Sequence, residues 1–263
     1  GVPFATHDAA IVNNGALALT AAPGIARTLR LPDLGNLFDR RPPGLDRVIG
    51  AAEANAGLLR DAQGWRAVVL PSMGDLVPDL GAGPVAIRSD GRRIVVAHDD
   101  GVFEVELPGA ATTQLHADTV PAALAYGVDG APLIAVGGTL LGAAGDGGSP
   151  ITSLVVASAA PVALARHEGG DITVWDIATG QITARWAPPA GTVRISISAN
   201  GAHACVSTLV DDQPSAAIVR VSDGAIIRHI VGARVIVCDP QDRGILVGGN
   251  WGALWMEPPR EAS

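Results

Sequence analysis

Side chains able to do chemistry are sparse in this 263-residue chain. Its six histidines show no His-x-x-x-His spacing and its two cysteines no Cys-x-x-Cys spacing, so we expect no metal site and no cofactor. The Gly-x-Ser-x-Gly elbow of serine hydrolases is absent, and GDGGSP lacks the lysine and following helix of a phosphate-binding loop. The histidines are His7, His98, His116, His167, His203 and His229.

Two pairs of adjacent carboxylates, Asp99–Asp100 and Asp211–Asp212, stand between alternating apolar runs. Each pair could bind a cation or a basic peptide, although a solvated turn is the simpler explanation. Cys205 and Cys238 lie in the apolar runs HACVST and VIVCDP, which favours small buried side chains. A disulfide between them is possible, but nothing in the sequence supports it.

Tryptophans fall into two groups. Trp65 and Trp251 each follow a turn signal, AQGW and GGNW, whereas Trp175, Trp186 and Trp255 lie within apolar runs. A tryptophan exposed at a turn is suited to anchor an interface. The same residue could instead start a strand and pack between sheets, so both readings of the first group stay open.

The elements that must position these residues are strands. Short alternating or apolar runs recur along the whole chain, separated by Gly, Asn, Asp and Pro, which predicts an all-β fold. Asn-Gly and Asp-Gly recur because a tight hairpin needs positive φ. Aligning the runs on these turns gives seven units of roughly 37 residues. The turn glycines are Gly15, Gly57, Gly91, Gly130, Gly201 and Gly244.

The segment GDITVWDIATGQ at 170–181 contains Trp175-Asp176, the dipeptide of a WD repeat. Over nearly its whole length the chain resembles WD-repeat or WD-like β-propellers of bacterial type. The Gly-His that opens a blade in that family is missing. Asp171 stands where the family has a turn aspartate, but the sequence identifies no histidine partner for it. The resemblance implies four-stranded blades arranged radially around a channel.

We therefore expect one β-propeller domain with seven four-stranded blades, or alternatively six. Residues 2–6 should close the ring by pairing with the last blade, because an open edge strand promotes aggregation. Residues 32–47 are expected to form a Pro-rich connection, and the fourth strand near 138–150 to be missing or irregular. The expected blades are 8–44, 45–83, 84–117, 118–150, 151–190, 191–231 and 232–263 plus 2–6.

In such a propeller the turns between second and third strands share one face of the disc. We predict that this face binds a partner, with the two turn tryptophans as anchors and the carboxylates as rim charges. The predicted binding residues are Trp65, Asp99, Asp100, His167, Asp211, Asp212, Asn250 and Trp251.

Composition narrows the class of partner. The net charge is −8, which opposes nucleic acid binding, and no apolar run is long enough to span a bilayer. The start GVPFATHDAA has neither the basic nor the apolar region of a signal peptide, so we expect a cytoplasmic protein unless a leader has been trimmed.

The expected function is not enzymatic. We expect a monomeric scaffold or sensor module that binds a protein or peptide, suited to being one part of a larger multidomain bacterial protein. The alternative is a propeller enzyme, such as a metal-assisted hydrolase with its site at the central channel. Mostly apolar inner strands disfavour that alternative, and the 3% content of aromatic residues disfavours a glycan-binding propeller.

Overall fold

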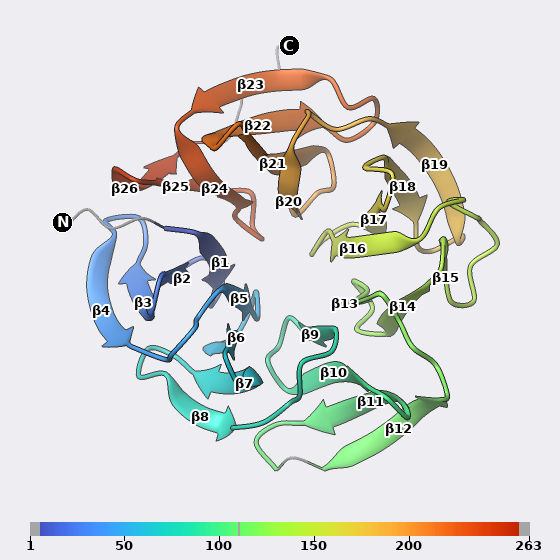
Figure 1. The fold of residues 1–263 in the computed structure, drawn as a ribbon, viewed down its shortest axis with the longest axis horizontal. Helices are drawn as coiled ribbons and strands as arrows, with labels where there is room; N and C mark the ends of the chain where they lie inside the picture. Colours follow the sequence, from blue (N-terminus) through green and yellow to red (C-terminus); the bar gives the residue numbers. More distant parts are fainter. Residues whose placement is uncertain (1–5, 110, 258–263) are drawn as a thin grey trace.

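A computed structural model describes residues 6–109 and 111–257 and shows a β-propeller, seven antiparallel sheets around a central axis (Figure 1). We name the sheets blades A to G in chain order. The described residues form strands and turns without a helix, and hence contain no helix that could cross a membrane.

The first four blades take up the blue to light-green half of the ring (Figure 1). Blade A contains β1 (Asp8–Val12), β2 (Leu17–Ala22), β3 (Ile25–Arg30) and β4 (Gly35–Arg40). Blade B contains β5 (Arg47–Gly50), β6 (Ala56–Asp61), β7 (Gly64–Val69) and β8 (Gly74–Val77). Blade C contains β9 (Val85–Ile87), β10 (Arg93–His98), β11 (Gly101–Glu106) and β12 (Thr112–Ala117). Blade D contains β13 (Ala123–Tyr126), β14 (Pro132–Val136) and β15 (Thr139–Leu140).

The remaining three blades complete the ring. Blade E contains β16 (Ile151–Val156), β17 (Val162–His167), β18 (Ile172–Asp176) and β19 (Gln181–Trp186). Blade F contains β20 (Thr192–Ile197), β21 (His203–Val210), β22 (Gln213–Arg220) and β23 (Ile226–Val231). Blade G contains β24 (Ala233–Cys238), β25 (Ile245–Gly249) and β26 (Gly252–Met256).

The prediction of seven blades is confirmed, and the six-bladed alternative is wrong. Each blade runs outward in chain order, so its first strand borders the channel and its last strand lies at the rim (Figure 1). Blades D and G have three strands each among the described residues. The expected Pro-rich connection at 32–47 is partly wrong, because it contains β4, whose side chains are mostly exposed at the rim and therefore carry no apolar pattern.

Ring closure joins blade A to blade G. The predicted closing strand falls at residues 2–6, of which 2–5 lie outside the described residues. Within the described part, Ala9 and Ile11 of β1 share an apolar cluster with Val235 and Val237 of β24. The first and last blades therefore pack directly against each other.

Hydrogen bonds connect the first turns of neighbouring blades. The Asn14 amide donates to the Ala52 carbonyl at 2.7 Å, and the Glu53 amide donates to the Ser89 carbonyl at 2.8 Å. On the other side of the ring, the Ala199 amide donates to the Asp242 carboxylate at 2.7 Å. These turns join the first and second strands and lie on one face of the disc. We call it the fastened face, because hydrogen bonds link its turns from one blade to the next.

Asp8 links three blades next to the channel. Its Oδ2 accepts a hydrogen bond from the Val48 amide of blade B at 2.9 Å, and its Oδ1 pairs with the Arg194 guanidinium of blade F. Arg194 also donates to the Ala9 carbonyl at 3.1 Å. Burial lowers the pKa of Arg194 to about 10, so its guanidinium remains charged at neutral pH.

Replacing Asp8 by alanine should destabilise the whole ring. Arg194 would then keep a half-buried charge without its carboxylate, and we expect the free energy of unfolding to fall by about 2–4 kcal/mol. Urea unfolding followed by tryptophan fluorescence measures this change. Asp33→Ala is the control, because its ion pair with Arg30 is exposed to solvent and should contribute far less to stability. Equal stability losses in both variants would contradict a linking role for Asp8.

Candidate functional site: the turn face of the disc

The turns between second and third strands lie opposite the fastened face. Successive strands of a blade run in opposite directions, so these turns and the connections between blades must share one face, which we call the turn face. Backbone hydrogen bonds link these turns to the segments that enter or leave the same blade. For example, the Leu209 amide of β21 donates to the carbonyl of Gly191, just before β20, at 2.8 Å. The loops of the turn face are therefore available for contacts outside the ring.

Six of the eight predicted binding residues occupy such turns and are exposed to solvent or border a hollow there. The turn between β21 and β22 takes φ values of +48° and +58°, a conformation that aspartate tolerates better than most residues. The two carboxylates of that turn are thus presented by the tightest possible hairpin. The six are Asp99, Asp100, Asp211, Asp212, Asn250 and Trp251.

The placement of Trp65 at an exposed turn is wrong. Trp65 lies within β7, is 5% exposed, and belongs to the apolar cluster between blades B and C, together with Leu58 and Ile94. The Arg60 guanidinium covers its ring at 5.7 Å from the centroid. The turn contains only residues 62 and 63, so Trp65 is already the second residue of β7 and its ring points between the sheets.

The placement of His167 in an exposed turn is also wrong. His167 is the last residue of β17 and is 2% exposed. Its Nδ1 lies 2.6 Å from the Ser149 carbonyl, which can only accept, so Nδ1 donates. Its Nε2 lies 2.7 Å from the Thr173 hydroxyl. Both ring nitrogens are used inside the fold, and His167 is unavailable to a partner.

His167 belongs to a buried chain of hydrogen bonds that sequence reasoning missed. The Trp175 indole N–H donates to the Thr173 hydroxyl at 2.8 Å, and the hydroxyl contacts His167. The Asp171 backbone carbonyl accepts from the His167 amide at 2.8 Å, so this turn aspartate acts through its main chain. The signal available in the sequence was the spacing of Thr173 and Trp175, which places both side chains on one face of β18.

An apolar patch lies on the turn face of blades F and G, and apart from Trp251 sequence reasoning missed it. Its members stand at strand ends or in turns, where polar residues are usual, and that unusual placement was the signal. Val231 is 80% exposed and Trp251 is 47% exposed. The F–G patch consists of Val193, Leu209, Val210, Val231 and Trp251.

Backbone contacts hold the members of the F–G patch together. The Gly232 amide donates to the Pro214 carbonyl at 2.9 Å, and Pro214 pairs with Leu209 across the β21–β22 hairpin. A Cβ at Gly232 would lie 3.6 Å from the Trp251 indole nitrogen. The indole therefore lies over the connection between blade F and blade G, next to Val231.

The turn face carries two acidic turns, one beside this patch in blade F and one in blade C. Elsewhere arginines pair with carboxylates, as in Arg40–Asp75 at 2.6 Å and Arg93–Glu104 at 2.8 Å. The carboxylates of the two turn pairs form no ion pair within the described ranges. Unpaired carboxylates at a rim attract a cationic partner and set its orientation.

Asn250 has a structural contact of its own. Its side-chain oxygen accepts a hydrogen bond from Arg234 Nε at 2.7 Å. This contact braces the β25–β26 turn that presents Trp251, and it leaves the Asn250 amide group as the end that can donate to a partner.

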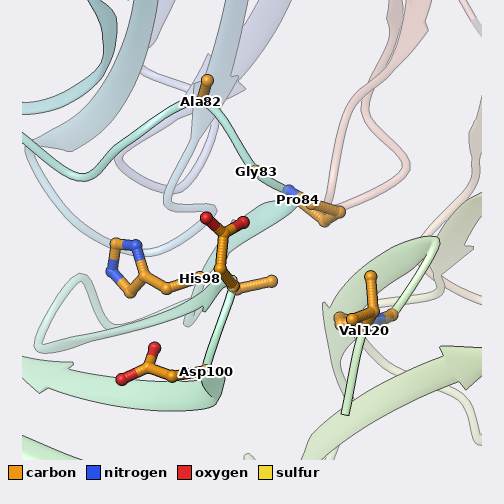
Figure 2. Close-up of a pocket in the computed structure, with 9 residues that line it drawn as sticks. Ala82, Gly83, Pro84, His98, Asp100 and Val120 are labelled. Atoms are coloured by element: carbon orange, nitrogen blue, oxygen red, sulfur yellow. The ribbon is translucent and has the colours of Figure 1, made fainter. Parts of the chain in front are cut away.

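A second feature of the turn face is an open hollow at blade C with a volume of about 530 Å³. Figure 2 shows His98 and Asp100 on one side of it and Val120 on the other, with Gly83 and Pro84 above them in the view. Val120 is 74% exposed. A Cβ at Gly83 would lie 2.3 Å from the Ala97 carbonyl, so a larger residue there would disturb the wall of the hollow.

The hollow and the F–G patch are separate on the ring, because blades A and B lie between blades C and G (Figure 1). Both combine apolar side chains with carboxylates that form no ion pair with another described residue. In the described part of the chain, no group of three or more His, Cys, Asp or Glu side chains is arranged to hold a metal ion.

Comparisons of the sequence with protein-family models and with curated proteins find no match.

Trp65 and Trp251, which the sequence predicted at turns, should differ in how much each contributes to the stability of the fold. Trp65→Ala removes a ring packed between two blades, and we expect the free energy of unfolding to fall by about 3–5 kcal/mol. Trp251→Ala trims an exposed ring and should change it by less than about 1 kcal/mol. Urea unfolding of both variants measures the difference. A larger loss for Trp251→Ala would show that its ring is part of the core.

Proposed function

We propose that this chain is a non-catalytic β-propeller of WD-like type that binds a peptide or protein segment on its turn face. The segment best suited to the F–G patch is extended, with at least one large apolar residue and one basic residue. The apolar residue would cover Trp251 and Val231, and the basic residue would pair with Asp211 or Asp212.

The observation that supports this function is the combination of exposed apolar side chains and unpaired carboxylates on the face whose turns are not fastened to one another. Burial of a tryptophan at the centre of an interface typically contributes more than 2 kcal/mol, whereas rim carboxylates act mainly on the rate of association. The F–G patch supplies the tryptophan to be buried, and the β21–β22 turn of blade F supplies the rim carboxylates.

The hollow at blade C would extend this surface. A partner long enough to cross the disc could place a second apolar group against Val120 and a second basic group beside Asp99 and Asp100. Two weak contacts joined in one chain bind much more tightly than either alone. Within this proposal the propeller is a monomeric scaffold or sensor module of a cytoplasmic bacterial protein.

Selection of peptides from a random display library on the purified propeller tests the proposal. We expect selected peptides to combine basic residues with large apolar ones. Trp251→Ala should weaken their binding by about 30-fold or more, corresponding to about 2 kcal/mol. Asp211→Asn with Asp212→Asn should slow association at low salt and leave dissociation nearly unchanged, since asparagine tolerates the same turn.

Phe38→Ala is the matched control for Trp251→Ala, because Phe38 is an exposed aromatic residue at the rim of blade A, within β4. It should leave affinity unchanged. Peptides that bind Trp251→Ala as tightly as the parent protein, or a selection that enriches acidic peptides, would overturn the assignment of this face.

A further inference from the structure

The interface between blades F and G contains the two cysteines of the chain. Cys205 lies on β21, the second strand of blade F, and Cys238 ends β24, the innermost strand of blade G. Both are buried, and their Sγ atoms lie 2.7 Å apart although 33 positions separate them in the sequence. Two thiol sulfurs without a bond normally rest farther apart than this. The fold therefore brings them to the distance at which a bond can form with little movement.

Side-chain hydrogen bonds fix the register of the two strands around the thiols. The Ser196 hydroxyl, on the β20 residue that pairs with Cys205, accepts from the Cys238 amide at 3.3 Å. The Ile236 amide donates to the Ser207 hydroxyl at 3.2 Å, two residues from each cysteine. Contacts on both sides of the two cysteines hold the strands in register, so the cysteines stay opposite each other across the interface.

We propose that Cys205 and Cys238 are a disulfide-forming pair that covalently joins the last blade to the sixth. This inference does not depend on the proposed binding function. The bond would fasten blade G, which has three strands among the described residues, on the side away from its contact with blade A.

The oxidant is a low-molecular-weight disulfide such as oxidised glutathione. One cysteine thiolate attacks it, forms a mixed disulfide and releases one reduced thiol. The second cysteine then attacks the protein sulfur of the mixed disulfide and releases another reduced thiol. Two protein thiols are oxidised to one disulfide, one small disulfide is reduced to two thiols, and the two protons end on the released thiols.

Burial determines when this exchange occurs. It raises the pKa of the Cys205 thiol and removes both sulfurs from solvent, so the folded protein reacts slowly in either direction. Where such an oxidant is present, the bond should form during folding, while blade G docks on blade F, and should resist reductants once the ring is closed.

Refolding of the fully reduced, denatured chain in glutathione buffer tests the pair. In oxidised glutathione we expect a product two hydrogen atoms lighter, with no thiol that alkylates after denaturation. In dithiothreitol we expect two alkylatable thiols and a melting temperature lower by roughly 5–10 °C. The same oxidation in denaturant should give much less of the bond, because proximity then depends on chance encounters.

Cys205→Ser and Cys238→Ser are matched single variants in which oxidation should leave the melting temperature unchanged. Two free thiols after refolding in oxidised glutathione would overturn the proposal. So would glutathione attached to either cysteine of the parent chain as the final product, or a bond that forms equally well in denaturant.

Discussion

Packing between neighbouring sheets is the constraint on which the rest of the structure depends. Each blade buries both of its faces against its neighbours, as shown by β1 and β2, in which every residue is buried. Such strands cannot alternate apolar and polar side chains, and where sheets approach closely only small residues fit. A Cβ at Gly50, for example, would lie 2.2 Å from a methyl carbon of Val12. Because no blade can bury these faces alone, the ring must close before any blade is stable.

Closure makes the two faces of the disc unequal. One face carries first turns that bond from blade to blade, with Gln241 of blade G donating to Asn14 of blade A at 2.9 Å. The charged link of Asp8 to Arg194 joins blades A and F at the opposite ends of their first strands, next to the channel. The packed sheets and the fastened face supply the stability of the ring, so the loops of the turn face are less constrained in sequence. They can therefore carry exposed apolar residues such as Trp251 and Val231.

Sequence periodicity predicted the blades because glycine-containing turns recur wherever a hairpin needs positive φ, as at Gly91 and Gly201. It also placed Asp211 and Asp212 correctly, since two adjacent aspartates between apolar runs favour a tight turn. It failed at Trp65 and His167, where one residue of shift along a strand changes solvent exposure to burial. Apart from Trp251 it missed the F–G patch, whose members come from separate hairpins and meet only after two blades pack together.

Hydrogen–deuterium exchange with a selected peptide bound tests the central claim most directly. A partner on the F–G patch should slow exchange of backbone amides in 208–215 and 249–252, with little change elsewhere on blades F and G. Slowed exchange in the first turns of those blades, 198–202 and 239–244, would place the partner on the fastened face and contradict the claim.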